Sequence, residues 1–562
     1  MNNENIWIYK EDDLDKNAIE NLSKQLNISN YSSILLLERG INTYDKAFKF
    51  FRSSFDNIHD SDLLNEIHEA VDIIHRYKDH NILIYGDYDV DGVTSIAMVY
   101  DFFKKYISKN TFYYVPDRFS EGYGLSHKVI DYSKQNNIKL IITFDCGTKD
   151  YEIIEKIKQE GIDIIVTDHH EVDENKKNPA NAFINPKRLD STYPFNELSG
   201  CGVGFKLLQS ICKNENINPH VLNNYIDLLT LSIACDLVPL IDENRIFMHY
   251  GLKKIKENPS PIMSILLNTL NITQINVETL VFRIGPLINA AGRITNASIA
   301  VDLLISDNPN VIHSLIEQII KMNKERKDVH TDMTNESIKM IKEADDNKNA
   351  NLLYKEGWNI GILGIVASKC VEQNNKPTII MTNKDDYIVG SARSVDGINI
   401  YNILTNCSEY LLRYGGHSFA AGITLSHDNL INFCNKFEEE LTKVINTETL
   451  VPKIYIDLKI PLYKITKNFL SIVNQMGPFG TQNMAPVLES EVYIVDIIHF
   501  KAKNILLIVE DEKGKKIEMV GFNMSNKISQ INNNKPVKVV YSLKCNENNQ
   551  QYVLKDIKSS LK

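Results

Sequence analysis

The sequence contains no closely spaced pair of cysteines. Its eight cysteines are scattered over 562 residues, and none forms a C-x-x-C pair. A disulfide framework or a thiolate zinc site needs cysteines at regular, close spacings, so both are disfavoured. The pattern fits a protein of a reducing cytoplasm.

Long hydrophobic runs are also missing. Residues 1–30 carry Glu, Asp and Asn throughout and have no apolar segment of the kind found in signal peptides. The longest apolar stretch, Leu228–Leu240, is interrupted by Asp236 and is too short to cross a bilayer. We therefore expect a cytoplasmic protein that makes no membrane contact.

Positive charge is in the minority, with 62 Lys and Arg against 72 Asp and Glu and a net charge of −10. Nucleic-acid binding relies on Lys and Arg at phosphates, so this balance argues mildly against it. Residues 496–562, however, carry twelve Lys against seven acids. The sign of the net charge of the whole chain therefore says little about nucleic-acid binding. A hydrophobic content of 43% and this length indicate an ordinary globular protein of roughly three to four domains.

Strand-like and helix-like segments alternate after a helical lead-in over residues 1–75. Alternation of this kind predicts right-handed βαβ units and a mostly parallel sheet. The expected strands are Asn81–Tyr85, Thr111–Val115, Lys139–Phe144 and Asp163–Thr167, and the expected helices are Val93–Lys105, Ser126–Gln135 and Lys149–Glu160.

Three carboxylates follow the first predicted strand, at Asp87, Asp89 and Asp91. Carboxylates this close repel one another unless a cation neutralises them. One alternative is a solvated acidic loop. A calcium loop of the EF-hand type is excluded, because its twelfth position, counted from Asp87, is Met98.

Further polar residues follow the later strands. Asp145 comes before a glycine turn, His169 and His170 end the next strand, and Asp236 lies in an apolar run where an ionised carboxylate needs a partner charge or a metal. In a parallel sheet these groups can meet in one crevice beyond the strand ends. Carboxylates with one or two imidazoles suit Mn²⁺ or Mg²⁺. One carboxylate shared by two ions would make a two-metal phosphoryl-transfer site.

The segments Asp87–Gly92, Asp145–Gly147 and Asp168–His170, together with Asp236, resemble the motifs of DHH phosphoesterases. The resemblance implies that His170 lies near the scissile phosphate. It also implies the metal ligands Asp89, Asp91, Asp145, His169 and Asp236. In one branch of that superfamily a His ligand precedes the first Asp by four residues, counting to Asp89, and here that position is Tyr85. Asp87 or a water would then take this place.

Four more segments resemble the RecJ exonucleases of the same superfamily, and the similarity runs from about Ile34 to the C-terminus. These segments are Pro116–Gly124, Ile184–Arg188, Leu198–Lys206 and Gly285–Arg293. Gly200–Gly204 opens a helix whose free N–H groups would hold an anion, or whose glycines serve close packing. Arg118 and Arg293 lie beside glycine-rich chain, where a guanidinium can bind phosphate or form a surface ion pair.

Residues 300–347 are predicted to form a connecting helix, and residues 348–448 resemble the DHHA1 domain. That resemblance implies that Ser391 and Arg393 hold a terminal 5′-phosphate together with Arg118. It also implies that His417, which follows two glycines, reaches the phosphate being cut.

Residues 449–562 change to short strands separated by turns, which is typical of an OB-fold barrel. The expected strands are Lys453–Ile460, Pro486–Ile497, Asn504–Glu510, Lys516–Phe522, Pro536–Ser542 and Gln551–Ile557. Lysines near the hairpin ends would track a single-stranded backbone, or they are ordinary surface lysines.

We expect an α/β protein with a DHH catalytic domain over residues 76–299 and a DHHA1 domain and barrel after it. The resemblance implies a 5′→3′ exonuclease for single-stranded DNA that uses two Mn²⁺ or Mg²⁺ ions, releases mononucleotides and serves recombination and repair. It would act as a monomer, with a helicase and a single-strand-binding protein as possible partners. The alternatives are a phosphodiesterase for short RNA or dinucleotides and a binding protein with an inactive site.

Overall fold

The computed structural model describes residues 5–344, 348–445, 450–529, 531, 535–546 and 549–560. By their internal contacts they form two compact units. The smaller unit joins Met1–Ile58 and Pro239–His249 to Pro452–Lys562, and the larger contains His59–Val238 and Tyr250–Val451. None of the described helices combines the length and the apolar character needed to cross a membrane.

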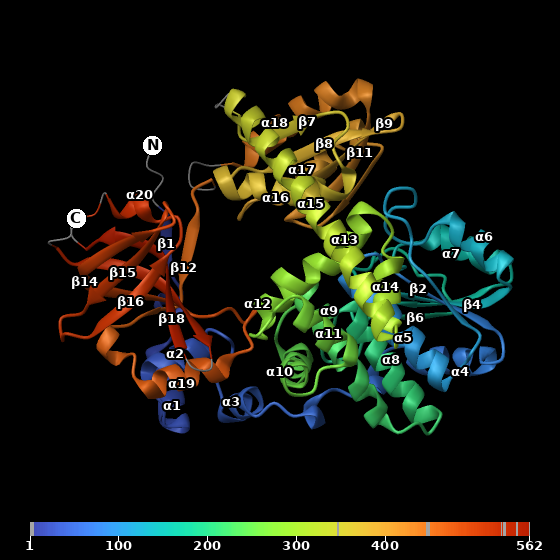
Figure 1. Cartoon of the computed structure of the whole chain (residues 1–562), viewed down its shortest axis with the longest axis horizontal. Coiled ribbons are helices and arrows are strands. Elements are labelled where there is room, and N and C mark those ends of the chain that lie inside the picture. Colours follow the sequence, from blue (N-terminus) through green and yellow to red (C-terminus); the bar gives the residue numbers. More distant parts are fainter. Residues whose placement is uncertain are drawn as a thin grey trace. The chain divides into compact units, whose positions relative to one another are not determined.

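The larger unit is built on a sheet of five parallel strands (Figure 1), which confirms the predicted parallel α/β fold. The strands lie in the order β3 (Thr111–Tyr114), β2 (Asn81–Gly86), β4 (Ile138–Phe144), β5 (Asp163–Thr167) and β6 (Ala182–Ile184). The last of these, only three residues long, was not predicted. Each neighbouring pair is parallel, so the carboxyl ends of all five strands lie at one edge.

Helices cover both faces of this sheet. On one face α6 (His127–Gln135) and α7 (Tyr151–Gln159) pack their apolar sides against strand residues such as Leu83 and Ile141. On the other face lie α5 (Val90–Tyr106) and α8 (Gly200–Asn214), and α9 (Ile226–Cys235) packs against both. Further helices of this region are α4 (Ile67–Tyr77), α11 (Pro261–Thr269), α12 (Val277–Thr279), α13 (Gly285–Ile294) and α14 (Ser298–Ile305). Helix α10 (Asp242–Glu257) is shared, because its residues up to His249 count with the smaller unit.

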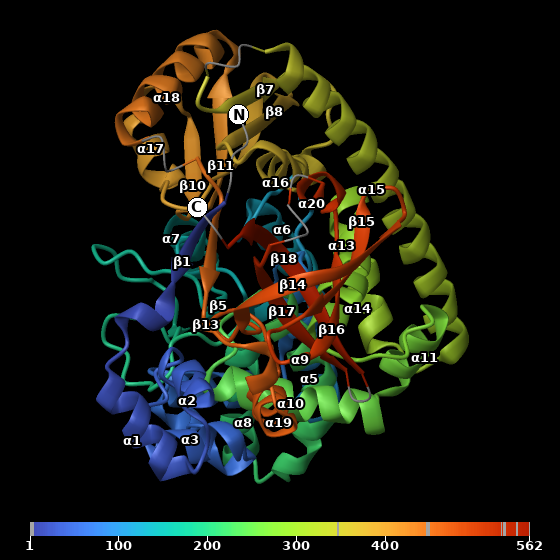
Figure 2. The same ribbon diagram turned by 90° about the vertical axis from the view of Figure 1, so that its left-hand side faces the viewer.

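A single 35-residue helix, α15 (Pro309–Glu343), leads from this region to a second sheet (Figure 2). The Asn308 side chain caps its first turn by accepting from Asn310 N. The second sheet has the order β10 (Arg413–Gly416), β11 (Ala420–Ser426), β9 (Tyr387–Arg393), β8 (Thr378–Lys384) and β7 (Asn351–Tyr354). Its helices are α16 (Leu363–Asn374), α17 (Ile400–Asn406) and α18 (Leu430–Val444).

The smaller unit contains a closed five-stranded barrel, as the OB-fold prediction required. Neighbouring strands are β14 (Val487–Phe500), β15 (Asn504–Glu510), β16 (Lys516–Gly521), β18 (Asn549–Ser559) and β17 (Val537–Asn546), and β17 pairs with β14 to close it. The strand expected over Lys453–Ile460 is instead two pieces, β12 (Lys453–Ile456) and β13 (Leu458–Lys459). The break falls at Asp457, whose side chain accepts from Val487 N at 2.7 Å.

The N-terminal residues belong to this unit through both sheet pairing and apolar packing. Strand β1 (Ile6–Tyr9) pairs in parallel with β12. Side chains such as Leu35, Phe469 and Leu488 share one buried core. This core takes side chains from the helices α1 (Lys16–Leu26), α2 (Asn30–Leu37), α3 (Tyr44–Phe51) and α19 (Lys467–Met476) and from the barrel.

Candidate active site

The first predicted site residues lie in the turn between β2 and α5. Asp89 caps the helix, and its Oδ1 accepts from Asp91 N at 2.9 Å and from Gly92 N at 3.3 Å. A Cβ at Gly92 would come within 2.3 Å of the Asp87 carbonyl oxygen, so only glycine allows this tight turn. The turn therefore presents Asp87 and Asp89 at the carboxyl edge of the sheet.

The N-terminus of α8 holds the Asp91 side chain. Gly200 N and Cys201 N donate to its two carboxylate oxygens at 2.6 and 2.8 Å, and Ser232 Oγ donates at 2.7 Å. The free N–H groups at the start of α8 thus bind an anion as predicted, and that anion is the protein's own Asp91 carboxylate. The glycine also serves close packing, since a Cβ at Gly200 would lie 2.7 Å from Asp145 Cβ.

Asp145 follows β4 in the left-handed region, with φ of 59°. A non-glycine residue in this conformation is strained by about 1–3 kcal/mol, and such strain clusters at functional sites. Its side chain is buried, and its Oδ1 lies 3.1 Å from His169 Nε2. The strained backbone directs this carboxylate toward the imidazole.

His169 Nε2 is the meeting point of three carboxylates. Besides Asp145, it lies 3.7 Å from Asp91 Oδ2 and 3.6 Å from Asp236 Oδ2, at the end of α9. Burial and the charge of His170 lower the pKa of His169 to about 3. The imidazole is therefore neutral at physiological pH and has a lone pair available for a metal.

The acids of this edge have histidines as their only basic neighbours within ion-pair distance among the described residues. Burial and the neighbouring Asp89 raise the pKa of Asp87 to about 8, and burial and Asp89 raise the pKa of Asp91 to about 6. The pKa values of Asp145 and Asp236 are also well above their ordinary range. Asp87 Oδ1 is buried without a hydrogen-bond partner. This unsatisfied oxygen and the mutual repulsion fit a site for divalent cations.

Ligand atoms close enough to share an ion form three overlapping groups, each within 4.8 Å. Asp145 and His169 occur in two groups each, so the groups adjoin. They are Asp87, Asp89 and Asp145; Asp91, His169 and Asp236; and Asp145, Asp168, His169 and His170. The structure thus brings together all five predicted ligands and the two other predicted residues of this edge, Asp87 and His170.

Asp168 has a role that the sequence did not indicate. Its Oδ1 accepts from His170 Nδ1 at 2.8 Å and from His169 N at 2.7 Å, and its Oδ2 accepts from Thr148 N at 2.9 Å. Burial alone would lower the pKa of His170, but the Asp168 charge and hydrogen bond raise it to about 9. Asp168 therefore orients a protonated His170.

Two tyrosines lie close to the site, one in contact with His170 and one at the position where one branch of the DHH phosphoesterases has a histidine ligand. The Tyr123 hydroxyl lies 3.1 Å from His170 Nδ1 and 3.2 Å from the Asp145 carbonyl oxygen, and no residue pattern indicated this placement. The Tyr85 hydroxyl donates to the Gly124 carbonyl at 2.7 Å, and its ring stacks on Tyr114. Tyr85 is thus part of the core, and Asp87 is the group that lies with Asp89 and Asp145.

Four arginines lie close to one another, and two of them, Arg118 and Arg293, also feel the charge of the acids Asp87 and Asp89. The Arg118 guanidinium stacks over Tyr88 at 4.0 Å from the ring centre, and its Nε is buried without a partner. Arg293 Nη1 donates to the Gly361 carbonyl at 2.8 Å, and burial with the charges of Arg118 and Arg326 lowers its pKa to about 10. Arg326, on α15, was not among the predicted residues.

Arg393 completes this positive group. Its Nη1 donates to Ser391 Oγ at 3.1 Å, and burial lowers its pKa. A Cβ at Gly364 would meet Arg393 Nη2 at 2.7 Å and Ser391 Oγ at 3.1 Å, so the glycine lets α16 approach both groups. No carboxylate in the described part of the chain forms an ion pair with any of these four arginines. They are free to bind an anion.

His417 lies in the turn between β10 and β11. Its backbone N–H donates to the Ala420 carbonyl at 2.7 Å, and Gly416 before it has φ of 144°. The surrounding protein and the charge of His170 lower the pKa of His417. The exposed imidazole makes no hydrogen bond to the acids of the edge within the described residues. His417 is therefore close enough to feel the charge of His170, but the described part of the chain shows no hydrogen bond between the two.

The fold and the site define a DHH-class chain. The model of the DHH family, N-terminal domain, matches residues 81–233, and the DHHA1 domain matches residues 347–443. The RecJ OB domain matches residues 456–555. The single-stranded-DNA-specific exonuclease RecJ of Bacillus subtilis is 32% identical over 98% of this chain and 70% of its own length. The chain belongs to the RecJ family.

Other relatives agree with this assignment. The protein of the same name from Escherichia coli is 28% identical over 86% of this chain and 88% of its own length. The crystal structure of RecJ with Mn²⁺ from Thermus thermophilus has the same fold, with a TM-score of 0.84 at 20% identity, covering 100% of this chain and 81% of that one. A structure of exonuclease RecJ bound to manganese matches 68% of this chain and 96% of that one, at 26% identity with a TM-score of 0.59.

Proposed function

We propose that this chain is a metal-dependent exonuclease that degrades single-stranded DNA from the 5′ end and releases mononucleotides. One observation carries the proposal: a dense group of buried acids and a neutral imidazole lies near four arginines that have no carboxylate partner among the described residues. In a DNA strand, the phosphodiester to be cut would lie at the acid group and its bound ions, and the terminal phosphate would lie at the arginines. Relatives named single-stranded-DNA-specific exonuclease support the substrate class.

The acid group would hold Mn²⁺ or Mg²⁺, the ions named for the related RecJ structures. Asp87 would add its unsatisfied oxygen to this set. The proposed ligands are Asp89, Asp91, Asp145, His169 and Asp236. When bound, such ions make a water nucleophilic at neutral pH and neutralise charge on the phosphoryl oxygens.

The residues around the acids would orient the scissile phosphate and donate hydrogen bonds to it. Protonated His170, fixed by Asp168, would donate to a phosphoryl oxygen as negative charge grows there. Tyr123 restricts the orientation of the same imidazole. His417 would approach the phosphate from the second sheet, since its exposed ring has no competing partner among the described residues.

The arginines would set the direction of digestion. Arg118, Ser391 and Arg393 would grip a terminal 5′-phosphate, and Arg293 would support them. A fixed end distance would then place the first internal phosphodiester over the acids. The C-terminal barrel would hold the strand further along, as single-strand-binding barrels do.

End-labelled substrates test this proposal. We expect a 5′-labelled single strand of a few tens of nucleotides to lose its label at once as mononucleotide in Mn²⁺ or Mg²⁺, while a 3′-labelled strand shortens progressively. A matched duplex and a chelator-treated reaction should remain undigested. Equal or faster turnover of a dinucleotide or of short RNA would favour the alternative phosphodiesterase instead.

The anchor is tested with the same assay. Arg393→Gln should slow digestion of a 5′-phosphorylated strand and reduce its advantage over a 5′-hydroxyl strand. Lys16→Glu, at an exposed position of α1, is the control and should change neither rate. If Arg393→Gln leaves the preference for the 5′-phosphate intact, the proposed anchor is wrong even though the nuclease assignment stands.

A further inference from the structure

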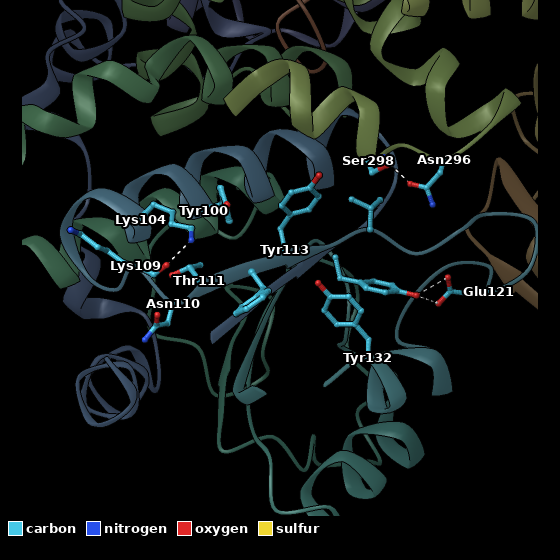
Figure 3. Close-up of a pocket in the computed structure, with 13 residues that line it drawn as sticks. Tyr100, Lys104, Lys109, Asn110, Thr111, Tyr113, Glu121, Tyr132, Asn296 and Ser298 are labelled. Atoms are coloured by element: carbon cyan, nitrogen blue, oxygen red, sulfur yellow. Dashed lines mark hydrogen bonds between the residues drawn. The ribbon is translucent and has the colours of Figure 1, made fainter. Parts of the chain in front are cut away.

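The two terminal strands of the parallel sheet, β3 and β6, differ in what lies beside them. Next to β3 is a hollow of about 600 Å³ (Figure 3). Several of its polar groups already bond within the protein: the Tyr113 hydroxyl donates to Asp302 at 2.5 Å, and Lys104 Nζ donates to the Lys109 carbonyl at 2.6 Å. At the β6 end of the sheet, by contrast, a buried amide bonds to the loop that carries His170.

This amide is the side chain of Asn185, the residue that directly follows β6. Asp168 N donates to the Ile184 carbonyl at 3.0 Å, so the end of β6 lies against the end of β5. Asn185 therefore reaches the carboxyl edge of the sheet where the acids lie, and the residue is only 2% exposed. The segment Ile184–Arg188, which resembles RecJ in sequence, thereby has a place beside the site.

The Asn185 amide is fully engaged in hydrogen bonds. Its Nδ2 donates to the His170 carbonyl at 2.9 Å and to Thr148 Oγ1 at 3.0 Å. Its Oδ1 accepts from Lys187 N at 2.8 Å. A backbone carbonyl can only accept, so the amino group and not the oxygen must face His170, which fixes the orientation of the amide. A buried amide with both ends paired holds rigidly the segments that it joins.

The same hydrogen-bond network also reaches the His170 ring. Thr148 N donates to Asp168 Oδ2 at 2.9 Å, and Asp168 Oδ1 accepts from His170 Nδ1 at 2.8 Å. Thr148 and Asp168 are both buried, so water has little access to replace these contacts. Asn185 therefore holds the main chain of His170 directly and its imidazole through Thr148 and Asp168.

We propose that Asn185 is a positioning residue for catalysis, which fixes the direction of the His170 imidazole by holding the His170 carbonyl and the Thr148 hydroxyl. This role rests on the proposed function, in which His170 donates to a phosphoryl oxygen. Asn185 itself bonds only to protein groups that lie behind the imidazole, so it acts through His170 and not on the substrate.

Asn351, in β7 of the second sheet, provides a matched control. Its amide is also buried, and its Nδ2 donates to Thr378 Oγ1 at 2.8 Å and to Asn374 Oδ1 at 3.1 Å. Both amides thus bond to a threonine hydroxyl, and removing either leaves buried polar groups without partners. If Asn185 only supported the fold, alanine at the two positions would have similar consequences for activity.

Steady-state kinetics on a 5′-phosphorylated single strand compare Asn185→Ala with Asn351→Ala. We expect Asn185→Ala to lower kcat by about 10–100-fold with little change in KM, the size typical of a lost orienting contact. Asn351→Ala should keep both constants within about twofold of wild type. A kcat of Asn185→Ala that equals that of Asn351→Ala overturns the proposal.

A double-mutant cycle separates positioning from general damage. His170→Gln removes the imidazole that Asn185 orients but keeps the backbone carbonyl, so adding Asn185→Ala should lower kcat by less than about threefold further. The same 10–100-fold fall in both backgrounds would show that Asn185 acts independently of His170 and would overturn the proposal. If wild type cleaves dinucleotides in place of DNA, the proposed substrate is wrong, and the same ratios measured on the dinucleotide still decide the role of Asn185.

Hydrogen exchange tests the network without any substrate. Peptides covering residues 167–172 should exchange at least about tenfold faster in Asn185→Ala than in wild type or Asn351→Ala, because the loop that carries His170 loses its buried anchor. Unchanged exchange in this loop would overturn the proposal whatever the nuclease assay shows.

Discussion

Two groups of buried carboxylates differ in how their charge is balanced. In the smaller unit, Asp457 accepts from Lys10 Nζ at 2.6 Å and from Val487 N, and it lies beside Glu38 and Arg39. In the larger unit, the acids around Asp145 have histidines as their only basic side-chain contacts among the described residues. The first group has two basic side chains, Lys10 and Arg39, beside its two acids. The second is balanced only when something else binds.

This difference separates a structural acid pair from a functional one. Burying a carboxylate is costly unless it is paired, so a fold that keeps several unpaired must recover that cost from a ligand. The strained backbone of Asp145 and the unsatisfied Asp87 Oδ1 belong to the same arrangement. The predictions below change one group at a time and ask whether stability or activity responds.

The largest effect is expected for Asp145→Asn. Asparagine tolerates the left-handed backbone and has the same shape, but it removes one charge. We expect digestion of single-stranded DNA to fall by at least about 10³-fold, or about 4 kcal/mol in the barrier. In chelator, the variant should melt at a higher temperature than wild type because repulsion is relieved.

The matched change in the other group is Asp457→Asn, which should lower stability with or without chelator and leave the chemistry intact. Calorimetry and the nuclease assay measure both quantities. If Asp145→Asn melted lower than wild type in chelator, the acids of the site would not be an uncompensated group, and the contrast would fail.

Asp168→Asn should have the next largest effect. It keeps the shape of the side chain that holds His170 Nδ1 but removes its negative charge. Loss of such orienting contacts typically costs about 10–100-fold, and we expect a fall of this size in kcat with little change in KM. Asp173→Asn, in the following loop, is the control. Equal loss in both variants would show a general loop effect.

Gly200→Ala should have a smaller effect, and Gly202→Ala in the same helix provides its control. A Cβ at Gly200 would press on Asp145 Cβ at 2.7 Å, whereas a Cβ at Gly202 meets nothing closer than 3.4 Å. We expect Gly200→Ala to lose about 1–3 kcal/mol of unfolding free energy and to impair catalysis. Gly202→Ala should stay within about 1 kcal/mol of wild type. Urea titration and the nuclease assay distinguish them.

Of the two carboxylate groups, only the acids of the candidate active site were predicted from the sequence. Four of the five strands of the parallel sheet were predicted almost to the residue, because each is an apolar run that ends at polar or glycine residues, whereas the three-residue β6 was missed. The acids and His169 stand at those ends, so sheet topology alone gathers them. Arg326 and Tyr123 were not found, because one arginine on a long polar helix and one tyrosine in a loop carry no periodic signal.

The balanced group was missed for a different reason. Glu38 and Asp457 are more than 400 residues apart, and each resembles an ordinary polar residue in its own segment. Only the packing of residues 1–58 with the barrel brings them together. No local pattern encodes that contact.

The smallest effect is expected for Glu38→Gln, and it depends on pH. Burial and the neighbouring Asp457 raise the pKa of Glu38 from its ordinary 4.5 to about 9. Between these values the folded protein holds a proton that the unfolded chain has lost, so the free energy of unfolding falls as pH rises. Glutamine removes this dependence. The variant should match wild type near pH 4.5 and exceed it by about 1 kcal/mol near pH 8.5, since water moderates the full effect. Urea unfolding followed by Trp7 fluorescence in a Trp358→Phe background measures this, with Glu20→Gln, exposed on α1, as the control. A gap that stays constant with pH would show that Glu38 is already compensated when ionised, and the two carboxylate groups would then differ in degree only.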